Sequence, residues 1–312
     1  MNTPNASAKP EKIALLKNSR SFIELRALAL RAVRDFFFNN GYLEVETPVR
    51  IASPAPETHI DPILSESLFL RTSPELQMKQ MLCAGYEKIF QIGPCFRKGE
   101  IGRIHNEEFT MLEWYQTGSD YLDLLNFTKK MIAETAKKVL KTEVCEFRGQ
   151  KIDLSPESWQ IFSVEEAFAK FAGIGATEAI GNGIFDQILV EKVEPNLPKN
   201  SPVVLIDYPA ELAAFAKLKN STPQLAERWE LYIGGVELSN TYSELTDYQE
   251  QKARFAKFAE ERAALGKETP PFDEDFLSAL RYGMPKCAGS ALGFDRLVMI
   301  FANAPDIKSV RT

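Results

Sequence analysis

Histidine is almost missing from this 312-residue chain, which contains only His59 and His105. Ser-His-Asp and Cys-His hydrolases need a catalytic histidine, and most zinc sites use histidine or paired cysteines. The four cysteines are scattered and form no Cys-x-x-Cys pair. The sequence therefore argues against a histidine-dependent hydrolase and against a zinc centre. Separate, reduced thiols are typical of a cytoplasmic protein.

Long apolar runs and a signal peptide are also lacking. No stretch of roughly 18 apolar residues occurs and the N-terminus is polar, so we expect a cytoplasmic protein that does not enter a membrane. The net charge of -6 gives no general attraction to nucleic acid. With 45% hydrophobic and 26% charged residues, the composition is that of a globular protein. We expect residues 1–18 to form a flexible tail and residues 19–312 a single domain.

Gly-x-Gly-x-x-Gly and Walker A loops do not occur, which argues against a Rossmann or P-loop fold. Apolar residues at helical spacing predict helices over residues 21–40, 73–85, 121–140, 247–265 and 295–301. Alternating or short apolar runs predict strands over residues 42–48, 67–71, 88–92, 108–115, 203–207, 229–233, 236–240 and 290–293. Weaker signals over residues 145–199 indicate an elaboration of the same domain. Hairpins with helices before and between them predict an α+β fold, an antiparallel β-sheet flanked by helices.

The strongest hairpin signal lies at Gly234–Gly235, the residue pair favoured in primed two-residue turns. Such a turn would pair Ile233 with Val236, Tyr232 with Glu237, and Glu230 with Ser239. Alternation then places Glu230 and Glu237 on one face as diagonal neighbours, close enough to share a cation such as Mg²⁺. Two solvated glutamates on an exposed face are the alternative. Asn240 and Glu244 could hold a cationic substrate or merely decorate a surface.

Two arginines stand where an anion could bind. Arg97 ends an apolar strand ahead of a polar loop, and a guanidinium there can grip a phosphate through two parallel hydrogen bonds, although a solvated loop is the alternative. Arg296 stands at a helix start, where the helix dipole disfavours a cation, so it indicates an anionic ligand or a salt bridge to Asp295. Between them in sequence, Glu113 and Tyr115 share a strand face. A glutamate among apolar neighbours needs a partner or a cavity.

Together these stretches resemble the three signature motifs of the class II aminoacyl-tRNA synthetases, specifically the lysyl subgroup. Gly41–Pro48 resembles motif 1, Phe96–Glu113 motif 2 and Ala291–Leu297 motif 3. The resemblance extends from about residue 19 onward. The lack of a preceding anticodon-binding domain, together with Thr72–Glu75 and Leu112–Tyr115, is similar to the paralogues that attach (R)-β-lysine to elongation factor P.

The resemblance implies a set of roles. The residues that it assigns to ATP are Arg97, Gly99, Glu100, Asn106, Glu237, Leu238, Gly293 and Arg296. It makes Arg97 and Arg296 the catalytic groups on the α- and γ-phosphates, and Glu230 and Glu237 the Mg²⁺ ligands. The residues that it assigns to the lysyl substrate are Ser73, Glu75, Tyr115 and Glu244, with Glu113, Asn240 and Ala291 nearby. It further implies a homodimer through motif 1, elongation factor P as the acceptor, and no tRNA.

Two positions differ from the lysyl enzymes. Ala291 stands where those enzymes have glycine, and an added methyl would favour the β-isomer by ~1–3 kcal/mol at most. The usual Arg-x-Glu of motif 2 is Arg97-Lys98-Gly99-Glu100 here, which displaces the glutamate by one residue.

The function that follows is an AMP-forming ligase. The carboxylate of (R)-β-lysine, or of lysine, would attack ATP to give an adenylate, and a lysine ε-amine of elongation factor P would then accept the acyl group. Two alternatives remain at this stage. One is a trimmed synthetase-like enzyme that activates α-lysine for another acceptor. The other is a catalytically silent paralogue that binds ATP or an amino acid as a regulator.

Overall fold

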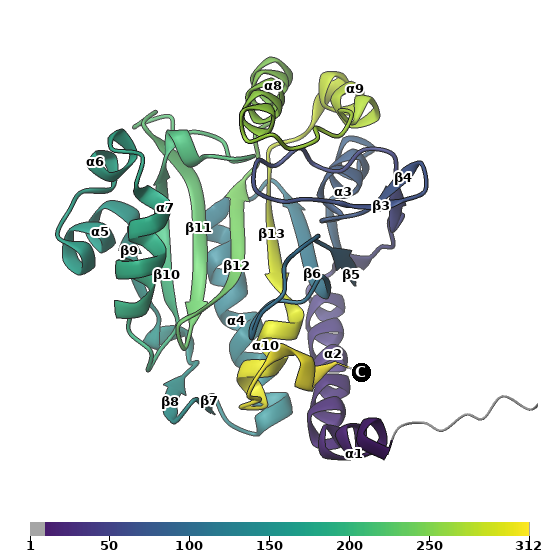
Figure 1. The fold of residues 1–312 in the computed structure, drawn as a ribbon, viewed down its shortest axis with the longest axis vertical. Helices are drawn as coiled ribbons and strands as arrows, with labels where there is room; N and C mark the ends of the chain where they lie inside the picture. Colours follow the sequence, from purple (N-terminus) through teal and green to yellow (C-terminus); the bar gives the residue numbers. More distant parts are fainter. Residues whose placement is uncertain (1–9, 312) are drawn as a thin grey trace, which may run out of the picture.

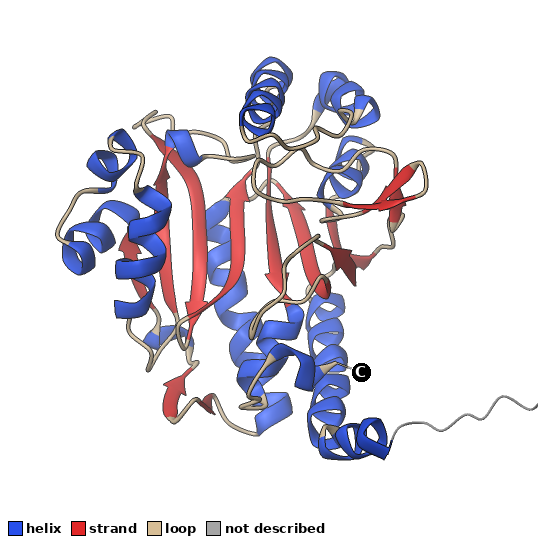
Figure 2. Ribbon diagram, in the orientation of Figure 1, coloured by secondary structure: helices blue, strands red, loops and turns tan. Residues whose placement is uncertain are grey.

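The computed structural model describes residues 10–311, except for the side chains of residues 10–12 and 15. Its centre is an eight-stranded sheet, which Figure 1 shows at the middle of the molecule. The strands follow one another across the sheet as β1 (Leu43–Glu44), β5 (Lys88–Phe96), β6 (Glu108–Thr117), β13 (Cys287–Gly293), β12 (Val236–Ser243), β11 (Leu225–Ile233), β10 (Val203–Pro209) and β9 (Gln160–Ser163). The central pairs are antiparallel, and only the edge pairs β1–β5 and β9–β10 are parallel. The predicted α+β fold is confirmed (Figure 2).

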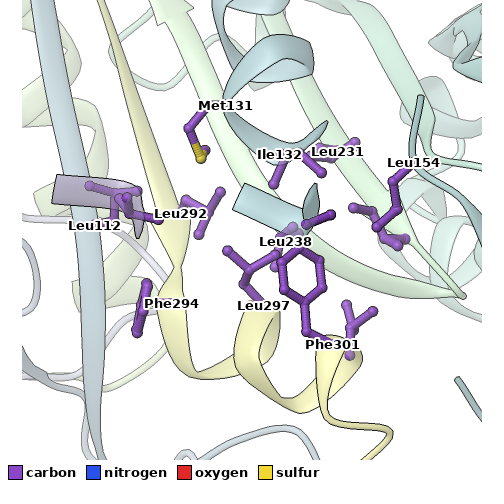
Figure 3. Packing of buried hydrophobic residues seen from close by; sticks show 14 of the residues in the cluster. Leu112, Met131, Ile132, Leu154, Leu231, Leu238, Leu292, Phe294, Leu297 and Phe301 are labelled. Atoms are coloured by element: carbon purple, nitrogen blue, oxygen red, sulfur yellow. The ribbon is translucent and has the colours of Figure 1, made fainter. Parts of the chain in front are cut away.

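Three helices cover one face of this sheet: α2 (Arg20–Asn39), α4 (Tyr121–Leu140) and α10 (Phe294–Phe301). Their apolar stripes meet the alternate apolar residues of the strands, which buries a continuous core. Figure 3 shows Leu231, Leu238 and Leu292 of the sheet among side chains of α4 and α10. Because this face is filled by the core, a ligand cavity can form only on the other face or at the strand ends.

Helices α3 (Glu75–Cys83), α8 (Tyr248–Ala264) and α9 (Glu274–Gly283) gather at one end of the sheet, at the top of Figure 1. At the β9 edge, α5 (Val164–Ala172), α6 (Ala176–Gly181) and α7 (Phe185–Ile188) pack into a second apolar cluster against β10. Small sheets are formed by β2 (Arg50–Ile51), β4 (Leu68–Leu70) and β3 (Ile63–Ser65), and by β7 (Val144–Phe147) and β8 (Gln150–Asp153). Short 3₁₀ or π turns span Pro156–Ser158, Leu189–Val193, Glu194–Asn196, Ala210–Leu212 and Ile307–Val310. No helix within residues 10–311 is both long and apolar enough to cross a membrane.

Two local predictions need correction. Part of the expected flexible tail forms helix α1 (Pro10–Asn18), whose alanine, leucine, lysine and glutamate are strong helix formers behind an N-terminal proline; residues 1–9 lie outside the described chain. The strand predicted over residues 42–48 shortens to β1. Beyond β1, the Thr47 N–H bonds to the side chain of Gln91 at 2.8 Å instead of joining a strand ladder.

The glycine hairpin forms as predicted near its turn but not further along. Ile233 pairs with Val236 and Tyr232 with Glu237, whereas Glu230 pairs with Asn240 and not with Ser239. The cause is a β-bulge at Leu238, which adds one residue to β12. Strict alternation would put Glu237 and Asn240 on opposite faces. The bulge lets both face the same side, while Leu238 enters the core.

Candidate active site

A cavity of about 300 Å³ lies on the sheet face opposite α2 and α4. Alternation along β6 directs Met111, Glu113 and Tyr115 into it, and Leu112 and Trp114 into the core. The sequence-predicted site residues that line it are Ser73, Glu75, Arg97, Glu100, Asn106, Glu113, Tyr115, Glu237, Leu238, Asn240, Glu244, Ala291, Gly293 and Arg296. Two predicted residues do not line it. Gly99 borders a neighbouring depression, and Glu230, which pairs with the lining residue Asn240, is itself buried by its hydrogen-bond partners.

The floor of the cavity is built on Glu113, which is almost fully buried. Its carboxylate accepts hydrogen bonds from the Ser73 hydroxyl at 2.8 Å and the Tyr115 hydroxyl at 2.7 Å. Burial, and then the nearby charge of Glu75, raise the pKa of Glu113 to about 7. The expectation that this glutamate has partners and faces a cavity is met.

Beside Glu113, one buried ammonium is shared by two carboxylates. Lys79, which is 1% exposed, lies one helical turn after Glu75 and contacts its Oε1 at 2.5 Å; it also contacts Glu244. Burial raises the pKa of Glu244 to about 8, although Lys79 opposes the shift. The pKa of Lys79 is itself raised, because the two carboxylates outweigh the effect of burial. With Glu113 included, three carboxyl groups face one cation, so the floor suits a further positive charge.

Gly289 makes room for this arrangement. It pairs with Tyr115 across β13 and β6, and a Cβ at Gly289 would come within 2.1 Å of the Tyr115 ring and 2.5 Å of the Glu244 carboxylate. Real Cβ atoms do not approach that closely. Only glycine therefore lets the tyrosine and the glutamate lie over the strand at this point.

The other end of the cavity carries the two arginines. The Arg97 guanidinium lies over the Phe109 ring, 5.2 Å from its centroid, and its Nη1 is 3.7 Å from the displaced motif 2 glutamate, Glu100. Its only hydrogen bond within the described chain is a long one of 3.5 Å to the Thr72 carbonyl. Arg97 is thus oriented by stacking while most of its donors remain available to an anion.

Arg296 is held more tightly. Its Nη1 donates to the Glu237 carbonyl at 2.8 Å and its Nη2 lies 2.7 Å from His105 Nε2. Because a guanidinium only donates, His105 accepts through Nε2 and is neutral. Burial, followed by the charge of Arg296, lowers the pKa of His105. Asp295 does not pair with Arg296; it bonds instead to Arg26 at 2.5 Å.

The two predicted metal ligands are not equivalent. Glu230 is buried and accepts hydrogen bonds from Arg228 and Tyr208, both at 2.6 Å, and from Tyr232 at 2.9 Å. Glu237 keeps 43% of its side chain exposed; partial loss of hydration at the cavity wall, and then the charge of Glu230, raise its pKa. The alternative of two solvated glutamates on an exposed face is therefore wrong for Glu230, and its role as a metal ligand stays a prediction. Its exposure is prevented by packing against β10, which the hairpin pattern alone does not reveal.

This donor set fits a Mg²⁺ ion that arrives on nucleotide phosphates. Within residues 10–311, no three His, Cys, Asp or Glu side chains gather as a metal cage. Mg²⁺ commonly needs only one or two carboxylates when phosphates and water supply its other ligands. Glu237 is the more exposed of the two and is held only by a 3.4 Å ion pair with Arg296 within the described chain, so it is the carboxylate that could contribute. The repulsion between Glu237 and Glu230 would be relieved by a cation.

Several residues that line or support the cavity escaped the sequence analysis. The ion pair between Glu75 and Lys79 could have been predicted, because the two residues are four apart on one helix. Arg228 orients Asn240 through a 3.2 Å bond to its Oδ1, and Asn240 in turn donates to the Tyr242 hydroxyl at 2.8 Å. The roles of Gly289 and Tyr242 could not be predicted from the residues next to them in sequence, because these roles depend on neighbouring strands.

Comparison with known families places this cavity in a class of enzymes. The family model for class II tRNA synthetases (D, K and N) matches residues 12–312. The chain belongs to this family, and residues of motifs 2 and 3 line the cavity together with residues of the glycine hairpin, whereas motif 1 does not line it.

Individual relatives fall into two groups. The chain is 38% identical to the lysine–tRNA ligase of Pelotomaculum thermopropionicum over 93% of its own length and 62% of that protein. It is 38% identical to the lysine–tRNA ligase of Moorella thermoacetica, over 91% of its length and 63% of that protein. It is 36% identical to the elongation factor P–(R)-β-lysine ligase of Proteus mirabilis, over 91% of its length and 92% of that protein. The chain thus spans less than two thirds of the lysine–tRNA ligases and nearly all of the β-lysine ligase.

Proposed function

We propose that this protein activates (R)-β-lysine with ATP and transfers it to a lysine ε-amine of elongation factor P. The observation that carries the proposal is the opposition of charge along one cavity. Arg97 and Arg296 face one end, where phosphates would bind. The other end has more carboxylates than cations, because Glu75, Glu113 and Glu244 surround the single ammonium of Lys79. An amino acid with two ammonium groups would bind there.

The first step needs no general base, because the attacking group is already a carboxylate. Its oxygen bonds to the α-phosphorus of ATP, the bond to the β-phosphate breaks, and pyrophosphate leaves. Arg97 would stabilise the charge that develops on the α-phosphate, and Arg296 would hold the γ-phosphate. Bound Mg²⁺, held through Glu237, would neutralise phosphate charge.

In the second step the acceptor ε-amine bonds to the acyl carbon, AMP leaves, and the amine loses a proton to give an amide. The near-complete coverage of the Proteus mirabilis ligase supports a protein acceptor. The four free cysteines suit the cytoplasm, where we place the reaction.

The choice of the β-isomer rests on Ala291. Its strand neighbours are Asn240 on one side and Glu113 on the other, so its methyl group lies between two residues that line the cavity. A methyl there would disfavour a substituent on the carbon next to the carboxylate. The second candidate is activation of α-lysine for another acceptor, which the likeness to lysine–tRNA ligases favours.

The test is a mass measurement on purified elongation factor P after incubation with the protein, ATP and either isomer. We expect a gain of one lysine minus one water on a single lysine, faster with (R)-β-lysine. A parallel incubation with tRNA should give no aminoacylated product. Modification with α-lysine alone would favour the second candidate. No amino-acid-dependent turnover with either isomer would overturn both.

We extend the proposal to a homodimer formed through the motif 1 segment. Leu28 and Phe38 of α2 and Leu43 of β1 are each at least 50% exposed, which is unusual for large apolar side chains near one edge. Light scattering should report a dimer that Leu43→Glu converts to monomer. Leu265→Glu, on an equally exposed leucine of the distant α8 end, should leave the dimer intact.

A further inference from the structure

One acidic residue of the cavity has no role in the mechanism above. Glu57 belongs to the loop between β2 and β3, and its side chain lines the cavity together with Arg97 and Glu75. Within the described chain, no residue donates a hydrogen bond to its carboxylate or lies within ion-pair distance of it; Glu57 is bonded only through its backbone carbonyl, which accepts from Arg262. A carboxylate that faces a cavity without a protein partner is a candidate for a ligand contact.

Glu57 lines the same cavity as Arg97 of the phosphate end and Glu75 of the floor, and the charges of both act on it. Burial raises the pKa of Glu57 to about 7, Arg97 and Arg228 oppose the shift, and Glu75 and Glu100 add to it. Glu57 thus lies within electrostatic reach of the phosphate-facing arginine and also of the acidic floor. In the proposed reaction, the substrate atoms nearest Glu57 would be those next to the reacting carboxylate, because that carboxylate must approach the phosphate held by Arg97.

The loop that carries Glu57 is fixed in place by Arg262 of α8. The buried Arg262 guanidinium donates to the carbonyls of Glu57 at 2.8 Å and Ile60 at 2.9 Å, and to the carboxylate of Asp61 at 2.9 Å. Thr58 adds a 2.6 Å bond to Glu261 on the same helix. These bonds run to consecutive parts of one loop, so the Glu57 backbone is held at the cavity edge before any ligand binds.

We propose that Glu57 is a specificity-determining residue that pairs with the substrate ammonium nearer the reacting carboxylate, while the floor acids take the distal ammonium. This inference rests on the proposed function, because it assigns the second charge of the same diamino acid. An amino acid with a single, distal amine would leave Glu57 without a partner. Glu57 would then select diamino acids over ω-amino acids of the same length.

The experiment compares wild-type protein with Glu57→Gln, which keeps the shape and removes the charge, and Glu57→Asp, which keeps the charge. Glu66→Gln is the matched control, since Glu66 lies on an exposed turn and only pairs with Arg50. Amino-acid-dependent pyrophosphate exchange gives the KM for the diamino acid and for ATP. ε-Aminocaproate, which lacks the proximal amine, is titrated as a competitive inhibitor.

We expect Glu57→Gln to raise the KM for the diamino acid on the order of tenfold, the usual effect of losing a charged hydrogen bond. The KM for ATP and the inhibition constant for ε-aminocaproate should stay unchanged, and Glu57→Asp should recover part of the affinity. Equal weakening of the diamino acid and ε-aminocaproate, or no change in either, would overturn the inference while leaving the proposed function intact. A wild-type protein that activates neither isomer would overturn the proposed function and this inference with it.

Discussion

The two ends of the cavity differ in how their charges are held. At the phosphate end, Arg97 and Arg296 remain 24% and 16% exposed and are oriented by an aromatic ring, backbone carbonyls and a neutral histidine. At the floor, Lys79 and Glu244 are each 1% exposed and contact one another directly. The charged groups of the phosphate end therefore remain partly hydrated and available to a ligand, whereas those of the floor are already removed from water.

This difference separates catalysis from selectivity. Desolvated acids that outnumber their cations are costly, and a ligand with matching charge relieves that cost, so the floor discriminates between amino acids. Hydrated arginines gain their full effect only when a charged phosphate excludes water, so they act on the transition state. Variants at the two ends should therefore change different kinetic constants.

Arg97→Ala should have the largest effect. Losing the guanidinium should remove ~2–4 kcal/mol of transition-state stabilisation and lower kcat for lysine-dependent pyrophosphate exchange, with little change in the KM for the amino acid. Arg103→Ala, on the same loop but exposed and bonded only to the Pro305 carbonyl, is the control. Exchange that survives Arg97→Ala would remove Arg97 from the mechanism.

Gly289→Ala should disrupt the acidic floor at the other end of the cavity. The new methyl would overlap Tyr115 and Glu244, and relieving that overlap should cost ~1–3 kcal/mol. We expect the KM for the diamino acid to rise while the KM for ATP does not, as measured by the same exchange assay. A rise in both constants would mean that the two ends are not separable. Gly181→Ala, in α6 with nothing within 4 Å of the added Cβ and no positive φ, is a control for the general effect of the substitution.

Arg262→Lys should have a smaller effect. Lysine cannot reproduce the fork of bonds to the Glu57 and Ile60 carbonyls, so the loop loosens and unfolding becomes easier by about 1 kcal/mol. Chemical denaturation measures this loss, and the exchange assay should show a severalfold rise in the KM for the diamino acid alone. An unchanged KM beside a lower stability would show that the loop position does not matter to binding.

The smallest effect is on pH dependence. With pKa values of about 7 and 8, Glu113 and Glu244 take up protons as the pH falls through about 8 to 7, so affinity for a dication, measured by calorimetry without ATP, should fall severalfold through that range. The same raised pKa values mean that the folded state holds protons that the unfolded chain releases above 4.5. Stability from these two groups is therefore complete below pH 4.5 and is lost as pH rises to about 8. Thermal unfolding should show that the diamino acid stabilises the protein most above that pH. An affinity that does not change with pH would contradict the claim that the floor has more carboxylates than cations.

The sequence predicted features that depend on neighbours along the chain. The glycine turn, the alternation that directs Glu113 and Tyr115 to one face, and the basic loop behind Arg97 are all local, and the structure has them. It missed features that depend on distant segments. The bulge at Leu238 was not foreseen because nothing in the hairpin itself demands it; packing of Leu238 into the core accompanies it.

The same reasoning explains the misjudged acids. Glu230 was predicted to share a cation with Glu237, but its carboxylate accepts a hydrogen bond from Tyr208 of β10, and β10 joins the hairpin only in the folded sheet. Glu57 was passed over because loop residues carry no periodic signal, and its position follows from bonds to α8, roughly two hundred residues away. Binding roles for the site residues, as opposed to their gathering in one cavity, remain predictions.

The most direct test of the account is pyrophosphate exchange with lysine isomers compared with the isostere in which the distal ammonium is replaced by a methyl group. If the acidic floor selects the substrate, the exchange rate with (R)-β-lysine or α-lysine should exceed that with the isostere by on the order of a thousandfold. The reason is that the apolar analogue would leave the buried carboxylates of the floor without a partner. Comparable exchange with the isostere would contradict the claim that the unbalanced carboxylates around Lys79 recognise the substrate.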